Sequence, residues 1–196
     1  MFNVVDVGFN SIFLRANKDL LELLKSFNLE HNKLKKFILK SENQIEKLYN
    51  EKKGVFTNYD IRNKKKIIVP SITNYFILFA DLKNQTINKK IIKNLKNHNQ
   101  TKKYIFSSIK PNYKKFEEKR YWRGPVWINC NWIIYQGLKN KDKNFANKIK
   151  EKTINLIKKN GIFKYYSFKT GKAFGASNFS WTATLFLDLI LENNYN

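Results

Sequence analysis

Apolar residues recur at helical spacing in the first 50 residues of the chain. Over Phe9–Phe27 they fall three or four positions apart, so they form one stripe on a helix. A second stripe runs through the Lys/Glu-rich segment Asn32–Asn50. The link Asn28–His31 between them is short, which favours an antiparallel hairpin. The pattern therefore predicts two packed helices.

The segment after this hairpin lacks the helical pattern, which returns further along the chain. Gly54 ends the second helix, and Val55–Ile68 is expected to be irregular or weakly extended. Pro70 and Ser71 then introduce a third helix over Ile72–Leu82. Thr86 is expected to cap a fourth helix that ends near Asn97.

Three more helices are expected in the second half of the chain. Pro125 occupies a first-turn position for a fifth helix, and Gly161 ends the sixth. An extended stretch and a turn separate the sixth helix from the last. The expected segments are Val126–Leu138, a helix from Asp142 or Lys143 to Lys159, extended chain over Ile162–Phe168, a turn over Lys169–Gly175 and a helix over Trp181–Leu191. Seven helices and little sheet predict an all-α protein, and the succession of helical hairpins is typical of a toroid or solenoid.

Composition narrows the class of protein. Hydrophobic residues make up 42% and aromatic residues 15% of the 196, so we expect a folded chain with a core. The longest apolar run is Tyr75–Ala80, far short of a membrane span. The amino terminus carries Asp6 and lacks a secretory signal pattern, which favours a cytoplasmic protein with no membrane partner. The chain has a single cysteine, Cys130, and only two histidines, so we expect no disulfide, no metal site and no cofactor.

The charge of the chain suggests nucleic acid as one partner class. The net charge is +23, but the basic residues are 34 lysines and four arginines, and they are spread along the chain. Nucleic-acid sites often favour arginine, so solvated lysines are the preferred explanation. A basic nucleic-acid-binding protein stays open as an alternative, and steep loss of binding with salt would mark it.

Two stretches depart from the lysine- and asparagine-rich composition. YWRGPVWINCNW, Tyr121–Trp132, holds three of the four tryptophans, and Gly161–Ala183 holds the fourth. Aromatic faces with a few polar groups suit sugar rings, although tryptophans on a helix also fill cores. Trp122 and Arg123 precede the fifth helix in a Gly-Pro turn, where side chains often line a site.

These stretches resemble a known family. YWRGPVWINCNWIIYQGL followed by GIFKYYSFKTGKAFGASNFSWTATLFLDLI resembles the carboxy-terminal half of the mannosylglycerate and glucosylglycerate hydrolases of glycoside hydrolase family 63, which are related to processing α-glucosidases and trehalases. NVVDVGFNSIFLRANKDL and FSSIKPNYKKFEEKRYW are also similar to this family. The resemblance implies that residues 1–196 are the carboxy-terminal part of a single (α/α)6 domain, a partial toroid, and that the activity is inverting hydrolysis of α-glycosides.

The resemblance also implies that the catalytic groups are incomplete. Inverting glycosidases need two carboxyl groups. The family's general acid lies upstream of the region that matches Asn3, and Lys164 stands where the family has its general-base glutamate. Ser167-Phe168 replaces the Asp-Pro that usually follows. We therefore expect no hydrolysis by this chain alone.

The resemblance assigns a set of aromatic residues to a pocket for a sugar or sugar acid. Arg123 is expected either to bind a carboxylate such as glycerate or to tie the turn to a helix carboxy terminus. The expected substrate-binding residues are Tyr121, Trp122, Arg123, Trp127, Tyr165, Phe179 and Trp181. Two interpretations stay open: part of a glycoside hydrolase whose amino-terminal half is encoded separately, or a non-catalytic remnant that binds a sugar or a partner.

Overall fold

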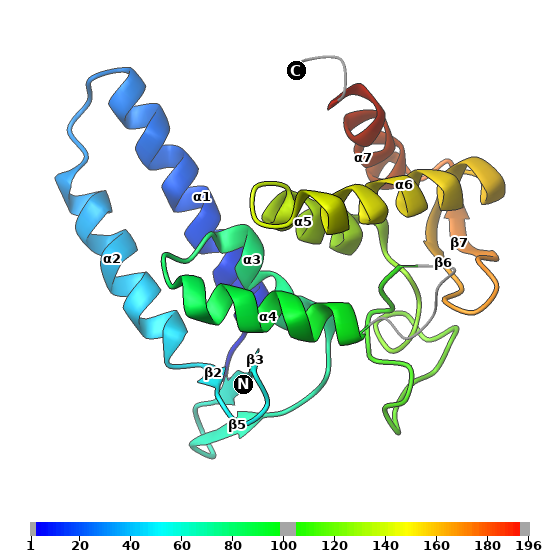
Figure 1. Ribbon diagram of the computed structural model, residues 1–196, viewed down its shortest axis with the longest axis horizontal. Coiled ribbons are helices and arrows are strands. Elements are labelled where there is room, and N and C mark those ends of the chain that lie inside the picture. The colour runs from blue at the N-terminus through cyan, green and yellow to red at the C-terminus, as the bar shows by residue number, and fades with distance from the viewer. Residues whose placement is uncertain (1–2, 99–104, 193–196) are drawn as a thin grey trace. The chain divides into compact units, whose positions relative to one another are not determined.

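A computed structural model describes residues 3–98 and 105–192 of the chain. The chain forms two compact units (Figure 1). Unit 1 comprises Met1–Val69 and Thr73–Asn94, and unit 2 comprises Pro70–Ile72 and Leu95–Asn196. Each unit is described by itself.

Unit 1 is built on the predicted helical hairpin. Helices α1 (Val7–Ser26) and α2 (Asn32–Glu46) lie side by side, in blue in Figure 1. Asp6 caps α1 by accepting a hydrogen bond from the Phe9 amide at 2.7 Å. The apolar side chains buried along the two helices are Val7, Leu14, Leu21, Ile38 and Ile45.

Short antiparallel strands flank the helical hairpin in the sequence. They form a sheet of β1 (Val4–Val5), β4 (Asn58–Asp60) and β5 (Lys65–Ile67), and a pair of β2 (Tyr49–Asn50) and β3 (Val55–Phe56). The prediction of extended chain here is confirmed. The prediction that the second helix continues to Asn50 is wrong, because Tyr49 pairs with Phe56 and both rings are buried.

Two further helical predictions need correction. Ile72–Leu82 is not one helix: a 3₁₀ turn at Ile72–Tyr75 is followed by α3 (Ile77–Ala80), and Asp81 ends α3 in the left-handed region with φ of 56°. α4 (Gln85–His98) is capped by Asn84 and not by Thr86, because Asn84 Oδ1 accepts a hydrogen bond from the Ile87 amide at 3.1 Å.

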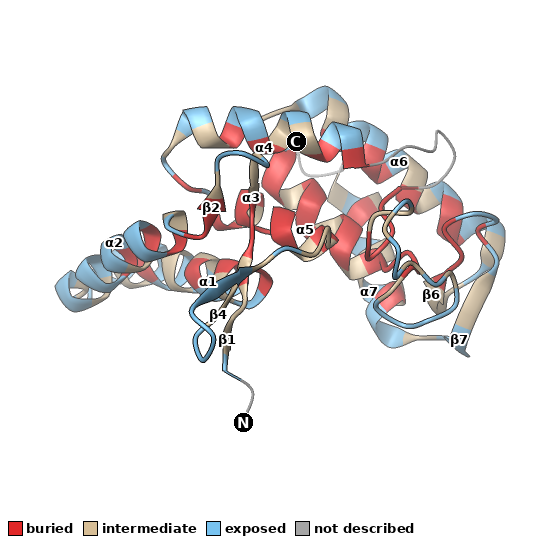
Figure 2. Cartoon of the chain, turned by 90° about the horizontal axis from the view of Figure 1, so that it is seen from below, coloured by how far each residue is buried: buried red, intermediate tan, exposed pale blue. Residues whose placement is uncertain are grey.

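Unit 2 contains the three remaining helices. They are α5 (Ile128–Leu138), α6 (Lys143–Asn160) and α7 (Ser180–Leu191), and an antiparallel hairpin of β6 (Phe163–Tyr166) and β7 (Ala173–Ser177) lies between α6 and α7. α5 is buried around much of its circumference, as the red ribbon in Figure 2 shows. Side chains from α5, α6, β6 and the residues next to them share a core that includes Val126, Ile128, Leu156, Ile157, Tyr166 and Phe168.

The ends of α5 and α6 show how local signals compete with tertiary pairing. The predicted start of α5 at Val126 is wrong, because the Val126 amide donates to the Tyr166 carbonyl at 2.8 Å and its carbonyl accepts in return at 3.0 Å. Pro125 therefore precedes the helix and does not lie in its first turn. Asp142 caps α6, and Gly161 with φ of +83° ends it, both as predicted.

The described residues contain seven α-helices and only short strands, which confirms the all-α class. None of the helices in the described part of the chain is long and apolar enough to span a bilayer.

Candidate functional site

An aromatic cluster in unit 2 brings together residues from three places in the sequence. They come from the loop before α5, from the β6–β7 hairpin and from the start of α7. We define the aromatic cluster as the rings of Tyr121, Trp122, Trp127, Tyr165, Phe174, Phe179 and Trp181, which are linked by close ring contacts or by Lys164 between them.

The centre of the cluster is a stack of three rings. Trp122 lies on Trp127 with ring centroids 4.2 Å apart and 9° between the planes. Tyr165 stacks against Trp127 at 5.0 Å and 28°. Tyr121 stands edge-on to Trp127 at 4.8 Å, and the Trp127 indole N–H donates to the Tyr121 carbonyl at 2.9 Å. Stacked and edge-on pairs are the favoured aromatic geometries, so these rings hold one another in place.

Exposure separates supporting rings from accessible ones. Trp127 is only 2% exposed because it is enclosed in the stack, whereas Trp122 is 41%, Tyr121 45% and Trp181 49% exposed. A ligand can therefore reach Tyr121, Trp122 and Trp181 directly. Trp127, which the sequence assigned to the pocket lining, instead supports the accessible rings.

Gly175 allows β7 to approach the cluster closely. Its φ is +76°, and a Cβ added there would lie 3.0 Å from both Lys164 Cβ and a ring carbon of Tyr165. A larger residue would therefore crowd two members of the site and would also be strained by the backbone angle.

Lys164 places a positive charge within the cluster. Its Nζ lies 5.1 Å from the centroid of the Tyr121 ring and 5.6 Å from that of Phe179. Both distances are within the range of cation–π attraction. The side chain is partly buried, and it forms no salt bridge with any residue in the described part of the chain. The structure thus brings Lys164 together with the predicted binding residues from all three segments.

Arg123, the other predicted cation of the site, is already paired. Its guanidinium lies 3.1 Å from Glu117, which Arg120 approaches to 3.4 Å. The hydrogen bond from Arg123 is the main cause that lowers the pKa of the Glu117 carboxyl. Arg123 therefore stabilises its own loop, by contact with a carboxylate and not with a helix terminus.

Two features of the site were missed by sequence reasoning. Phe174 joins the cluster through Tyr165, with ring centroids 6.1 Å apart. The partly buried Glu118 accepts a hydrogen bond from Ser167, which is fully buried. This bond links the loop that carries Tyr121 to the hairpin that carries Lys164. The only sequence signal was the replacement of Asp-Pro at Ser167.

The described residues offer no metal centre and no reactive thiol. They contain no group of three or more His, Cys, Asp or Glu side chains that could hold a metal ion. Cys130 is buried in α5, and burial raises the pKa of its thiol. Cys130 is therefore a small core residue.

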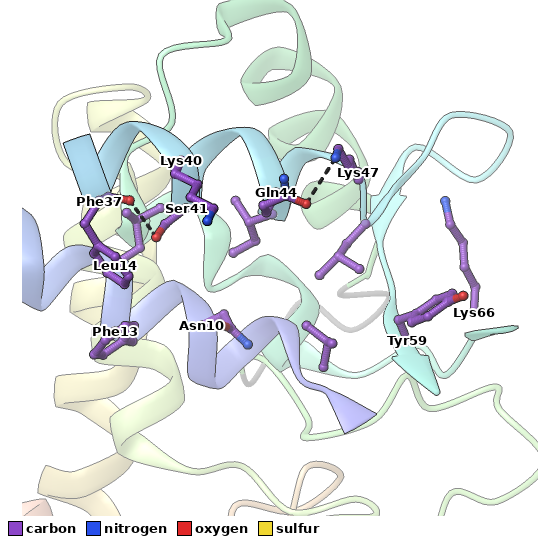
Figure 3. Close-up of a pocket in the computed structure, with 13 residues that line it drawn as sticks. Asn10, Phe13, Leu14, Phe37, Lys40, Ser41, Gln44, Lys47, Tyr59 and Lys66 are labelled. Atoms are coloured by element: carbon purple, nitrogen blue, oxygen red, sulfur yellow. Dashed lines mark hydrogen bonds between the residues drawn. The ribbon is translucent and has the colours of Figure 1, made fainter. Parts of the chain in front are cut away.

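Unit 1 contains a separate cavity of about 550 Å³ (Figure 3). It lies between α1, α2 and the β1–β4–β5 sheet, and Phe13 and Phe37 form one wall with ring centroids 6.0 Å apart. Apolar and polar side chains share its lining, and Lys40, Lys47 and Lys66 are among the polar ones. Sequence reasoning did not find this cavity because its residues come from separate elements.

Comparison with known proteins gives a consistent result. The family model for the mannosylglycerate hydrolase MGH1-like glycoside hydrolase domain matches residues 1–182. Mannosylglycerate hydrolase from Thermus thermophilus is 33% identical over 189 residues, which are 95% of this chain and 45% of the relative. The chain thus spans about half the length of the curated relatives it matches.

Solved structures show the same relationship. A GH63 mannosylglycerate hydrolase from Thermus thermophilus, solved in complex with glucose, superposes with a TM-score of 0.89 and 31% identity, covering 94% of this chain and 48% of that enzyme. The same enzyme has been solved with Tris and D-glycerate. Neutral trehalase Nth1 from Saccharomyces cerevisiae shares the fold, with a TM-score of 0.71 and 14% identity. The match covers 96% of this chain and 38% of the trehalase. The chain therefore belongs to the mannosylglycerate hydrolase MGH1-like glycoside hydrolase family.

Proposed function

We propose that this chain is the carboxy-terminal part of a single (α/α)6 glycoside hydrolase domain, that its aromatic cluster binds a small sugar or sugar acid, and that it does not hydrolyse glycosides by itself. The observation that carries the proposal is the aromatic cluster, with Tyr121, Trp122 and Trp181 exposed and the other rings behind or beside them. The ligands present in the Thermus thermophilus relative, glucose and D-glycerate, support this class of ligand.

Aromatic faces give the sugar site its physical basis. The C–H face of a pyranose ring is apolar and stacks on an aromatic ring, while its hydroxyls remain free for hydrogen bonds. Trp122 is backed by Trp127 and Tyr165, so its ring is held in one orientation and loses little further freedom on binding. The prepared surface favours binding of a flat sugar face.

The absence of hydrolysis follows from Lys164. An inverting glycosidase uses a carboxylate to take a proton from the attacking water. An ammonium group has no lone pair to accept that proton, and Lys164 stands at the position that the family resemblance gives to the base. The carboxylates of Glu117 and Glu118, in the loop before α5, are engaged by Arg123 and by Ser167 respectively.

The decisive experiment restores the missing base. Lys164→Glu is made in a fusion of this chain to the part of the Thermus thermophilus enzyme that it does not cover, and release of glucose or mannose from the glycosylglycerates is measured. We expect a gain of about 10²-fold or more over the unsubstituted fusion, the usual size of a general-base contribution. Lys169→Glu, which makes the same charge change at an exposed position, is the matched control. A folded Lys164→Glu fusion with no gain would contradict the assignment of this position.

The rest of the glycoside hydrolase fold is the proposed partner of unit 1. In the relatives, more than half of the length lies outside the matched region. The missing part is supplied either by a separately encoded amino-terminal half or by the same polypeptide. The cavity beside Phe13 and Phe37 and the 72% exposure of Phe9 provide an apolar surface for it.

Size-exclusion chromatography of this chain mixed with the uncovered part of the Thermus thermophilus enzyme tests that surface. A complex that Phe13→Asp abolishes and Leu187→Asp preserves is expected, because Leu187 is equally apolar and exposed but lies on α7. Equal loss in both variants would argue against the cavity as the docking surface.

A further inference from the structure

We propose that Lys164 makes the aromatic cluster selective for anionic ligands, and that its ammonium group binds the carboxylate of a sugar acid whose sugar ring lies on the exposed aromatic faces. This inference rests on the proposed sugar site and names the residue that determines its specificity. The structure supports it in four steps.

The ammonium group is held at the site by its stem. Lys164 lies on β6, and its Cβ and Cδ lie 3.0 and 3.4 Å from where a Cβ on Gly175 would be. The side chain therefore packs along the hairpin, and its Nζ reaches the rings of Tyr121 and Phe179. Packing of this kind reduces the conformational freedom that a long side chain loses on binding.

The charge of Lys164 is not neutralised by the described residues around it. No carboxylate among them forms a salt bridge with it, and the segment Gly161–Leu187 contains no Asp or Glu at all. Glu117 is engaged by Arg123, and the nearest cation to Glu118 is Lys169 at 4.0 Å. The ammonium group therefore retains N–H donors for an incoming anion.

The aromatic surroundings strengthen an interaction with an anion. Two rings displace water from the sides of the ammonium group, and a charged hydrogen bond gains strength as water is excluded. A neutral sugar offers this charge only uncharged hydroxyl acceptors, and a bare carboxylate offers nothing to the rings. A sugar acid uses both.

The alternative cation of the site does not serve this purpose. Arg123 already forms an ion pair with Glu117, which balances its charge. Lys164 has no such partner among the described residues. The geometry therefore assigns the ligand carboxylate to Lys164.

Titration calorimetry with four probes tests the assignment: glucosylglycerate, its neutral counterpart glucosylglycerol, D-glycerate and glucose 6-phosphate. We expect the unsubstituted chain to bind glucosylglycerate about tenfold or more tighter than glucosylglycerol, the size of effect that a hydrogen bond to a charged group supplies. Lys164→Gln should abolish this preference, so that glucosylglycerate and glucosylglycerol bind with similar affinity. Lys164→Arg, which keeps the charge, and Lys169→Gln, which removes an exposed charge on the same hairpin, should both retain it.

The outcomes separate this inference from the proposed function. A preference for glucosylglycerate that survives in Lys164→Gln would overturn the role of Lys164, with sugar binding intact. D-glycerate binding that depends on Lys164, without glucosylglycerol binding, would support Lys164 and contradict the sugar site. Tighter Lys164-dependent binding of glucose 6-phosphate would overturn the carboxylate as the anion. Binding of none of the four probes would overturn both proposals. Thermal melts confirm that each variant is folded.

Discussion

Trp122 and Trp127 are in contact, yet they are expected to contribute differently. Trp127 is enclosed, so Trp127→Ala leaves a cavity and should lower the free energy of unfolding by about 3–5 kcal/mol. Trp122 is partly exposed, so Trp122→Ala should cost only about 1–2 kcal/mol but should weaken sugar binding by roughly tenfold. Chemical denaturation and ligand titration of both variants measure the two effects. A Trp122→Ala variant with unchanged affinity would remove this ring from the binding surface.

Gly175 is expected to be intolerant of substitution. Gly175→Ala combines a strained backbone angle with crowding against Lys164 and Tyr165, and we expect a loss of about 1–3 kcal/mol of stability together with weaker ligand binding. Ala176→Ser, a change at the exposed next residue, should alter neither property. Circular dichroism melts and titrations compare the two. Retained affinity in a folded Gly175→Ala chain would show that the hairpin can move without disturbing the site.

Much of the residue content of the site could be predicted from the sequence, because the tryptophan and glycine stretches stand out from a lysine-rich background. The structure brings Tyr121, Lys164 and Phe179 together as expected, and their binding roles remain predictions. A core role for Trp127 was one of the two interpretations that the sequence left open, and its enclosure agrees with that role. The bond between Glu118 and Ser167 could not be predicted, because it depends on which side chains meet in space, and a linear pattern does not contain that information.

At the scale of single elements, capping residues make a testable contribution. Asp142 caps α6 and lies 2.6 Å from Lys96, and the hydrogen bond from Lys96 is the first cause that lowers the pKa of its carboxyl. Asp142→Ala should cost about 1 kcal/mol of stability through loss of the cap. Asp142→Asn keeps a capping oxygen and should cost less, because it loses only a partly exposed ion pair. Urea denaturation of both variants gives the comparison, and a larger loss for Asn would contradict the capping account.

Helices were predicted better than their ends. In α1, α2 and α6 the apolar residues repeat at helical spacing over several turns, so these helices were predicted with small errors at their ends. The first residues expected in α5 instead pair with β6, since Val126 exchanges two hydrogen bonds with Tyr166. This pairing joins segments 40 residues apart and overrides the helix signal of Pro125. Sequence reasoning failed where a distant partner decides the backbone.

At the scale of the whole molecule, stability should depend on pH through His98. This residue is buried at the end of α4, and burial lowers its pKa from 6.5 to about 4, with the positive charge of Lys110 as a further cause. Because the folded-state pKa lies below that of the unfolded chain, the unfolded state binds more protons between these two values. The free energy of unfolding should therefore fall as pH decreases from about 6.5 to about 4, by an amount on the order of 3 kcal/mol.

Unfolding measured across this pH range checks the contribution of His98. His98→Gln should flatten the dependence even if it lowers stability overall. His31→Gln, a change at the other histidine of the chain, should leave the dependence in place. An unchanged slope in His98→Gln would assign the effect to other groups.

In the proposed function, the molecule combines a prepared aromatic surface with a lysine at the position of the family's catalytic base. Family membership establishes the relationship to glycoside hydrolases, and the replacement at Lys164 separates binding from hydrolysis in the proposed function. The two properties can be measured in the same sample.

The most direct test of this account is a thermal melt of the purified chain followed by circular dichroism, with and without glucosylglycerate, alongside an assay for released glucose. We predict a cooperative helical melt whose midpoint rises with ligand concentration, because a ligand that binds only the folded state stabilises it, and no release of glucose. Release of glucose by the unsubstituted chain, or a midpoint that the ligand leaves unchanged, would contradict the central claim.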